Sequence, residues 1–287
     1  MSVARGTETF AELTWRRFLR HRPAVAALAI LAILGLVASL APWIAPYGRD
    51  DQNLDAMLVP PSAHHFFGTD ALGRDVFSRI LHGGRISLFV GLTVMLVALF
   101  IGVLLGVASG YYGGFLDALV MRGVDLMLSI PLFFVLLLLA ARFEPSLGLL
   151  VFSLGLTSWM AVTRLVRASF LSLREKEFVE AARALGSRDG NIIFGHILPN
   201  CLAPIMVAAT LGVAEAILVE SALSFLGFGI QPPTPSWGNM LEDAQEFMSS
   251  APWLAVFPGF MIFLTVLCLN FLGDGLRDAL DPRLRSN

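Results

Sequence analysis

The stretch EFVEAARALGSRDGNIIFGHILPN, residues 177–200, is a polar, helix-forming segment between two long apolar runs. If residues 176–185 form a helix, one side carries an apolar stripe at i, i+3, i+4 and i+7, which consists of Phe178, Ala181, Ala182 and Leu185. The alanines keep this stripe shallow, so another protein can approach it closely. Gly186 can end the helix in the left-handed conformation, and Ser187 can cap the next one. Because two spans can be joined by a few residues, we interpret residues 177–200 as a docking element.

The composition is that of a membrane protein. Of the 287 residues, 56% are apolar and 15% are charged, a balance that a soluble domain could not bury. Apolar runs long enough to cross a hydrocarbon core of about 30 Å are found at 24–45, 86–109, 119–141, 147–166, 202–223 and 253–272. The first run is too long for a cleaved signal peptide, so we expect it to be retained. The sequence predicts an all-α, polytopic protein with six transmembrane helices.

Positive charges orient these helices, because cytoplasmic segments of membrane proteins carry the excess of Lys and Arg. Residues 1–23 hold five of them, residues 164–188 hold six and residues 274–287 hold three, which makes fourteen. The opposite side receives five, four in residues 46–85 and Arg142. Both termini are therefore expected in the cytoplasm. The predicted plan is a cytoplasmic segment 1–23, a first span 24–45, an extracytoplasmic loop 46–85, a core domain 86–273 with five spans, and a cytoplasmic tail 274–287. The core includes the cytoplasmic segment 177–200 and the extracytoplasmic loop 224–252.

Special residues mark two of the runs. Gly102, Gly106 and Gly110 follow each other at four-residue spacing, which favours close packing against another helix. Pro131 lies inside run 119–141 and is expected to bend it, since proline removes a backbone donor. Bending of this kind can serve gating, but proline is common in membrane helices. Arg122 is placed to pair with a neighbouring carboxylate one turn away, Asp125.

Two carboxylates, Glu215 and Glu220, lie deep in run 202–223, where a charge is costly in lipid. Either they are hydrogen-bonded inside a helix bundle, or they line a polar, water-accessible translocation path. The sequence favours the path for Glu220 and leaves both interpretations open for Glu215.

Catalytic and cofactor motifs are missing from the sequence. It has no GxxxxGK[ST] loop, and its sole lysine, Lys176, lies between two glutamates. HExxH, CxxC and GxSxG patterns are also missing, and Cys201 and Cys268 fit small core residues. We therefore expect no catalytic residue, no metal site, no cofactor and no nucleic-acid partner for this chain. An ion-coupled carrier using Glu215 and Glu220 as relay groups is an alternative, but it leaves residues 177–200 without a role.

The sequence EAARALG at residues 180–186, followed after nine residues by HILP at 196–199, resembles the EAA motif of inner-membrane permeases of bacterial ABC importers. In that family the segment forms a coupling helix that docks on the ATP-hydrolysing subunit. The only departure is His196, where the family has an aliphatic residue. The resemblance assigns ATPase coupling to Glu180, Ala181, Ala182, Gly186, Leu198 and Pro199, with Phe178 and Leu185 on the apolar face of the helix.

Three longer stretches are similar to the second permease of dipeptide and oligopeptide importers. They are TWRRFLRHRPAVAALAIL at 14–31, HHFFGTDALGRDVFSRILHGGRISL at 64–88 and ALSFLGFGIQPPTPSWGNML at 222–241. The resemblance implies a multi-pass protein of the bacterial inner membrane that forms half of a peptide pathway. It implies a homologous second permease, two ATP-binding subunits that hold ATP and magnesium, and an extracytoplasmic solute-binding protein as partners. Some members of the group carry nickel chelates or glutathione, so those substrates remain alternatives.

Two predictions concern the loops. In the first loop, Gly68-Thr69-Asp70 is expected to form a turn and to cap a short amphipathic segment that contains Val76 and Ile80. The Arg and Asp residues of that loop are interpreted as scaffolding. In the second loop, residues 237–247 are predicted to form a short interfacial helix anchored by Trp237.

Overall fold

The protein is described by a computed structural model that covers residues 10–143 and 146–280. This part of the chain is helical and contains no strand, and an isolated bridge joins Thr69 to Asp75. The all-α prediction is confirmed. The helices are α1 (Phe10–Arg20), α2 (Arg22–Ser39), α3 (Ala41–Ile44), η1 (Leu54–Ala56), α4 (Val76–Tyr112), α5 (Gly114–Ser129), α6 (Leu132–Arg142), α7 (Leu147–Arg174), α8 (Glu177–Ala184), α9 (Asp189–Asn191), η2 (Ile192–Ile197), α10 (Leu198–Phe225), α11 (Trp237–Ala244), η3 (Gln245–Phe247) and α12 (Trp253–Leu280).

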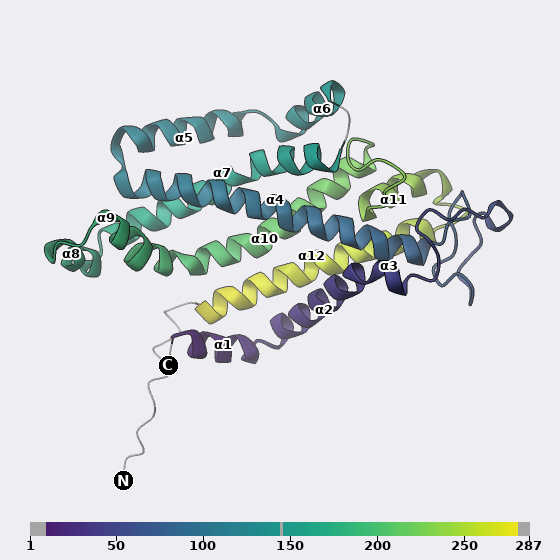
Figure 1. Ribbon diagram of the computed structural model, residues 1–287, viewed down its shortest axis with the longest axis horizontal. Coiled ribbons are helices and arrows are strands. Elements are labelled where there is room, and N and C mark those ends of the chain that lie inside the picture. The colour runs from purple at the N-terminus through teal and green to yellow at the C-terminus, as the bar shows by residue number, and fades with distance from the viewer. Residues whose placement is uncertain (1–9, 144–145, 281–287) are drawn as a thin grey trace, which may run out of the picture.

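The long helices form one bundle with two distinct ends. Helices α4 and α7 share the most extensive contact, α10 packs on α4, α7 and α12, and α2 lies on α12. Successive long helices run in alternating directions, so that α8 lies at one end of the bundle and α11 at the other (Figure 1). These ends are called the α8 end and the α11 end below. Helix α1 packs against the last turns of α12, so both ends of the described chain lie at the α8 end.

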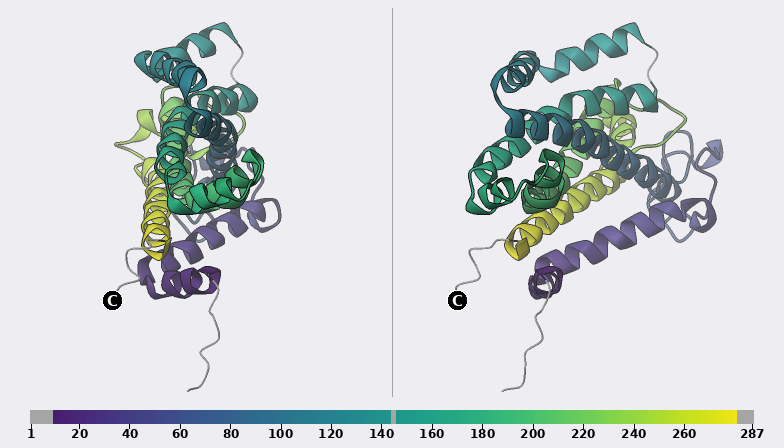
Figure 2. Two further views of the ribbon diagram at one scale, coloured as in Figure 1. Left: turned by 90° about the vertical axis from the view of Figure 1, so that its left-hand side faces the viewer. Right: turned by 60° about the vertical axis from the view of Figure 1, so that its left-hand side comes forward.

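Five helical stretches are long and apolar enough to cross a membrane: α2, α4, α7, Asp189–Phe225 and α12. They correspond to five of the six predicted runs. The sixth run, 119–141, is divided between α5 and α6. The chain becomes extended at Ile130 and Pro131, in agreement with the expected bend. Figure 2 shows α5 and α6 along the outer side of the bundle, beside α4 and α7. That this pair forms a sixth pass stays a prediction.

The glycine spacing in α4 is explained by its contact with α7. A Cβ atom added to any of the three glycines would lie 2.6 Å from the Cβ atom of a residue of α7. The pairs are Gly102 with Val162, Gly106 with Val166 and Gly110 with Phe170. The helices can therefore approach closely only because these positions lack side chains.

Both loop predictions need correction. Helix α4 begins at Val76, and Asp75 caps it by accepting the Ser78 N–H at 2.8 Å. The first loop therefore ends at residue 75. The expected amphipathic segment forms the first turns of α4. Its cap is Asp75 and not the Gly68-Thr69-Asp70 turn. The short helix after residue 236 is confirmed as α11. Its Trp237, however, is 1% exposed and donates its Nε1–H to the Ile80 carbonyl at 3.1 Å, so it packs inside the bundle and not at a lipid interface.

Candidate functional site

The helix at the α8 end has the local structure that its sequence predicts. Helix α8 covers Glu177–Ala184, with Lys176 and Leu185 as its flanking residues. Gly186 follows with φ of +80°, a conformation that side-chain-bearing residues rarely adopt. The N–H of Ser187 then donates to the Ala182 carbonyl at 3.0 Å, which closes the helix in the pattern expected for a glycine cap. Ser187 does not cap the next helix, because Arg188 occupies the position before α9.

The two sides of α8 differ in a way that only the structure reveals. Val179 and Ala182 are buried against the body of the protein. Leu185 is 86% exposed, and Phe178, Ala181 and Glu180 are also exposed. Ala182 was expected on the apolar docking stripe but lies on the inner side. The outer face therefore presents Phe178, Ala181 and Leu185, without Ala182.

A polar contact holds the segment after α8 against the end of α4. The hydroxyl of Tyr111 donates to Asp189 Oδ1 at 2.6 Å, and the guanidinium of Arg183 lies over the Tyr111 ring, 5.8 Å from its centroid. Arg174 Nη1 donates to the Tyr111 carbonyl at 3.2 Å. Val179 belongs to the same apolar cluster as Tyr111. Displacement of α8 is thus resisted by α4 as well as by the adjoining helix α7.

A second polar group joins α4, α5 and α7 at the same end. Arg167 of α7 donates its Nη2–H to Asp117 Oδ2 of α5 at 2.6 Å, and the Ser109 hydroxyl of α4 donates to the same carboxylate. Further along, Arg164 pairs with Asp125 at 2.5 Å. The expected pair of Arg122 with Asp125 is therefore replaced by a contact between α5 and α7. These contacts attach the outlying α5 to the bundle.

The remaining residues of the EAA-like segment lie where the chain enters α10. Leu198 is the first residue of α10, and Pro199 follows it, where the missing N–H of proline costs little. The preceding η2 is a short π-helical stretch whose Ile192, Ile193 and Ile197 are buried. Leu198 is half-buried and Pro199 is exposed. In the chain, η2 therefore lies between α8 and these two residues, Leu198 and Pro199.

Glu220 and Glu215 occupy opposite environments on α10. Glu220 is fully buried and accepts hydrogen bonds from the hydroxyls of Ser224 at 2.8 Å and Ser87 at 3.2 Å. The Ser87 oxygen also accepts the Trp237 N–H at 3.2 Å, so the carboxylate connects α4, α10 and α11. In this conformation Glu220 does not reach a surface. Glu215 is exposed, although its neighbours Ala214 and Ala216 are buried.

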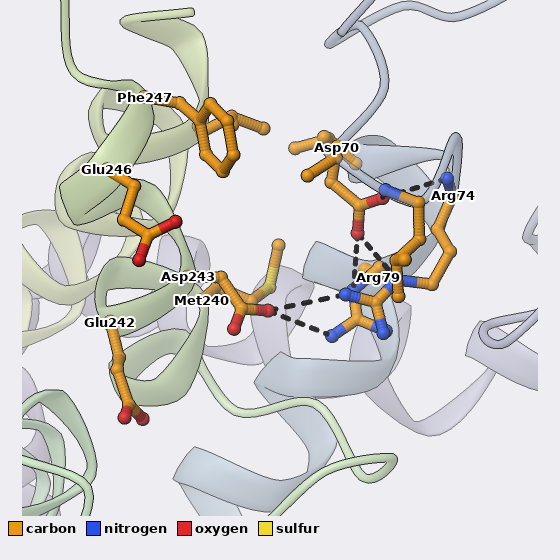
Figure 3. A pocket seen from close by; sticks show the side chains of 12 residues that line it. Asp70, Arg74, Arg79, Met240, Glu242, Asp243, Glu246 and Phe247 are labelled. Atoms are coloured by element: carbon orange, nitrogen blue, oxygen red, sulfur yellow. Dashed lines mark hydrogen bonds and ion pairs between the residues drawn. The ribbon is translucent and has the colours of Figure 1, made fainter. Parts of the chain in front are cut away.

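A charged cavity of about 330 Å³ lies at the α11 end, between the first loop and α11. Two buried arginines form one wall, and acidic residues of α11 and η3 face them (Figure 3). Arg74 Nε lies 2.6 Å from Asp70 Oδ2, and Arg74 Nη2 lies 3.3 Å from Asp243 Oδ2. Arg79 lies 3.7 Å from the Asp70 carboxylate and 3.8 Å from that of Asp243. Arg74 of the loop thus pairs directly with Asp243 of α11, and Arg79 of α4 lies within ion-pair distance of both Asp70 of the loop and Asp243.

The acidic side of this cavity is only partly neutralised. Burial raises the pKa of the Asp243 carboxyl, while Arg79 and Arg74 act to lower it. Burial, and then the charge of Asp243, raises the pKa of Glu242. Glu246 is exposed beside them. The scaffolding interpretation of the loop charges is supported for Asp70, Arg74 and Arg79. That interpretation considered only charges of the loop itself and omitted Asp243, which is 169 positions from Arg74 and is not visible as a partner in the sequence.

Metal-ligating residues do not cluster in the described parts of the chain: no group of three or more His, Cys, Asp or Glu residues is placed to hold an ion. Cys201 and Cys268 are both free and buried.

The bundle of long apolar helices, with a capped polar helix at one end and a charged cavity at the other, is that of a multi-pass membrane permease. The chain belongs to the family of the binding-protein-dependent transport system inner membrane component, whose model matches residues 102–286. The model of the N-terminal TM domain of oligopeptide transport permease C matches residues 9–61.

Relatives match along nearly the whole chain. The dipeptide transport system permease protein DppC of Escherichia coli is 46% identical over 94% of this chain and 92% of the relative. DppC of Alkalihalophilus pseudofirmus is 45% identical over 95% of this chain and 90% of its own. The oligopeptide transport system permease protein OppC of Haemophilus influenzae is 45% identical over 94% of this chain and 88% of the relative. These matches confirm the resemblance carried by residues 14–31, 64–88 and 222–241.

A solved structure shares the fold. The chain is similar to a chain of the MetNI methionine ABC transporter in an inward-facing conformation, with a TM-score of 0.58 and 18% identity. The match covers 70% of this chain and 95% of the other. The helices of this chain are therefore arranged like those of that ABC-transporter chain.

Proposed function

We propose that this chain is one permease subunit of an ATP-driven importer for dipeptides or oligopeptides. The support is the 41–46% identity, over nearly full length, to proteins named as permeases for such peptides. Under this proposal the chain forms half of the translocation pathway with a homologous second permease. It lies in the bacterial inner membrane, with the α8 end and both termini in the cytoplasm. A solute-binding protein delivers peptide at the α11 end.

Helix α8 is the proposed docking element for an ATPase subunit. The observation that carries this assignment is its outer face, where Phe178, Ala181 and Leu185 are exposed while the inner face is fixed by Val179. An exposed apolar helix at the far end of a bundle is typical of a surface that a partner covers. Glu180 lies beside this face, and Gly186 fixes where the helix ends.

The proposed mechanism is alternating access. Two partner ATPase subunits hold ATP and magnesium, and their closure around ATP displaces the docked α8. Because Tyr111 ties the following segment to α4, the displacement reaches the bundle and opens it toward the α11 end. Hydrolysis then restores the inward-facing state. ATP shifts the equilibrium because it binds the partner with different affinity in the two states.

Two substitutions test this coupling. Glu180→Lys reverses an exposed charge, and Gly186→Pro is incompatible with a φ of +80° and removes the N–H that donates to the Arg183 carbonyl at 2.9 Å. In the assembled importer, both are expected to abolish peptide uptake and the stimulation of ATP hydrolysis by peptide-loaded binding protein, with the permease still inserted. Glu175→Lys, at a side chain 77% exposed and outside α8, is the control and should retain both.

Two results would reject the proposal. Normal stimulated hydrolysis in both variants would show that α8 is not the coupling element. Solute movement by the isolated chain down an ion gradient, without nucleotide, would instead establish an ion-coupled carrier.

A further inference from the structure

One side of helix α10 carries a continuous stripe that is half-buried at Pro204 and Ala208, exposed at Leu211 and Glu215, and contains a single charge. The stripe repeats at i, i+4, i+7 and i+11 and so occupies one side of the helix: Pro204, Ala208, Leu211 and Glu215. Leu211 and Glu215 are exposed, whereas the opposite side, with Val213, Ala214 and Ile217, is buried in the bundle. Glu215 is thus directed away from the chain's own core.

The depth of Glu215 restricts what can lie against it. It is the eighteenth of the 28 residues of α10, about 15 Å from the end of the helix at the α11 end. No hydrogen bond or ion pair of Glu215 is found within the described residues. A lone carboxylate at this depth is strongly disfavoured in lipid. The exposed side of α10 therefore faces protein or water in the assembled transporter.

A groove continues from this stripe toward the α8 end. Its volume is about 470 Å³, its floor is α10, and Leu165 of α7 and Leu280 of α12 form its sides. Leu211 marks its boundary, and Glu215 lies four residues, or about 6 Å, beyond. Because the floor of the groove and Glu215 belong to one side of one helix, the groove also faces away from lipid.

The groove has one charged residue among its lining, Arg277 of α12. Its side chain is exposed, and no carboxylate partner for it is found in the described ranges. Within the described ranges, the face thus places a carboxylate without an ion-pair partner deep along α10 and a guanidinium without one nearer the α8 end, with apolar surface between them. An extended dipeptide or tripeptide spans about 7–11 Å and carries an ammonium at one end and a carboxylate at the other.

We infer that Glu215 binds the amino-terminal ammonium of the peptide as it moves along the path, and that Arg277 receives its carboxylate nearer the α8 end. This inference rests on the proposed function, since it assigns two contacts to the proposed substrate. The apolar floor between the charges makes no hydrogen bonds to particular side chains, so peptides of different sequence can pass.

The first test measures peptide transport by the complete importer in liposomes, with the binding protein saturated. Rates are compared for a peptide with a free amino terminus and for the same peptide acetylated. Glu215→Gln should slow the free peptide about tenfold relative to the unsubstituted complex, but should leave the rate of the acetylated peptide nearly unchanged. The ratio of variant to unsubstituted rate is taken for each peptide, so the preference of the binding protein cancels. Glu215→Asp should restore transport, and Glu175→Gln serves as the matched control.

Arg277 is tested in the same way with a carboxyl-terminal amide. Arg277→Gln should slow the peptide with a free carboxylate and spare the amide. Equal ratios for modified and unmodified peptides would overturn the assigned contacts, even though peptide transport itself persists. If the unsubstituted importer moves no peptide at all, the proposed function fails first, and the inference fails with it.

A second measurement separates a path from a subunit contact. Glu215→Cys should react with a water-soluble, cationic methanethiosulfonate, and transported peptide should slow that reaction. Leu96→Cys, on an exposed side of α4 without charges, is the control and should react slowly in both conditions. An inert Glu215→Cys, together with loss of complex assembly in Glu215→Gln, would show that Glu215 pairs with the second permease and would refute the inference.

Discussion

Tyr111 and Asp189, 78 positions apart in the chain, are joined by a 2.6 Å hydrogen bond between the end of α4 and the segment that follows α8. The contact connects the segment that follows the proposed docking helix to the longest helix of the bundle, α4, which extends to the α11 end and carries Arg79 and Ser87 there. A movement of α8 can therefore reach both ends of the protein through one continuous helix.

Removing this hydroxyl is expected to weaken coupling without disrupting the fold. Tyr111→Phe retains the ring under Arg183 and loses only the bond to Asp189, a hydrogen bond to a charged group that contributes about 1.5–3 kcal/mol. Peptide uptake per ATP hydrolysed should fall severalfold, measured with the reconstituted importer. Tyr112→Phe is the matched control because Tyr112 is 60% exposed. Unchanged coupling in Tyr111→Phe would mean that α4 does not transmit the movement.

The two sides of α8 should respond differently to truncation. Leu185→Ala should reduce binding of the ATPase subunits, because an exposed apolar contact is lost, with little change in the stability of the permease itself. Val179→Ala opens a cavity in a fully buried position and should lower the free energy of unfolding by about 1–3 kcal/mol. Thermal stability of the isolated permease and co-purification of the ATPase distinguish the two effects. Destabilisation of the isolated chain by Leu185→Ala would contradict an outward-facing role.

The contact between α4 and α7 should tolerate no side chain at Gly106. An alanine there would place its Cβ 2.6 Å from that of Val166 and 2.8 Å from the Thr163 carbonyl, so the helices must separate. Overpacking of this kind costs about 1–3 kcal/mol. Gly123→Ala is the control, since the added Cβ has no neighbour within 4 Å. The melting temperature in detergent should fall for Gly106→Ala alone, and equal values for both variants would count against the close packing.

Several local features could be predicted from the sequence because each depends on the residue type itself. The left-handed Gly186, the break at Pro131 and the glycine stripe of α4 need no knowledge of distant partners. The environments of Glu215 and Glu220 do need it. Five residues at about 100° each place them roughly 140° apart around α10, so only one can face the core. Because α10 is apolar on all sides, no pattern in the sequence shows which one that is. The structure buries Glu220, the residue favoured for the path, and exposes Glu215.

Glu220→Gln separates a structural role from a transport role. The carboxylate accepts from Ser87 and Ser224, and replacing one oxygen by an NH₂ group forces one hydroxyl to lose its acceptor. Because Ser87 also accepts the Trp237 N–H, we expect weaker attachment of α11 and a free energy of unfolding lower by about 1–3 kcal/mol. Limited proteolysis near residues 226–236 should quicken. Slower transport with an unchanged proteolysis pattern and melting temperature would instead favour Glu220 as part of the path.

The ion pairs of the α11-end cavity give the last prediction. Asp243 faces two arginines, Arg74 and Arg79, whose side chains are 10% and 3% exposed. Asp243→Asn leaves this buried positive charge with Asp70 and, 3.9 Å from Arg79, Asp50 as its remaining partners, and breaking such a network costs about 3–5 kcal/mol when both partners are buried. Asp243 is 41% exposed, so we expect a smaller loss, about 1–2 kcal/mol, together with looser packing of the first loop on α11. Glu246→Gln, in the same cavity but outside the network, is the control and should change neither property. Hydrogen exchange of residues 53–75 reports the loop directly: faster exchange in Asp243→Asn than in Glu246→Gln supports the network as the clamp on this loop, and equal exchange in the two variants rejects it.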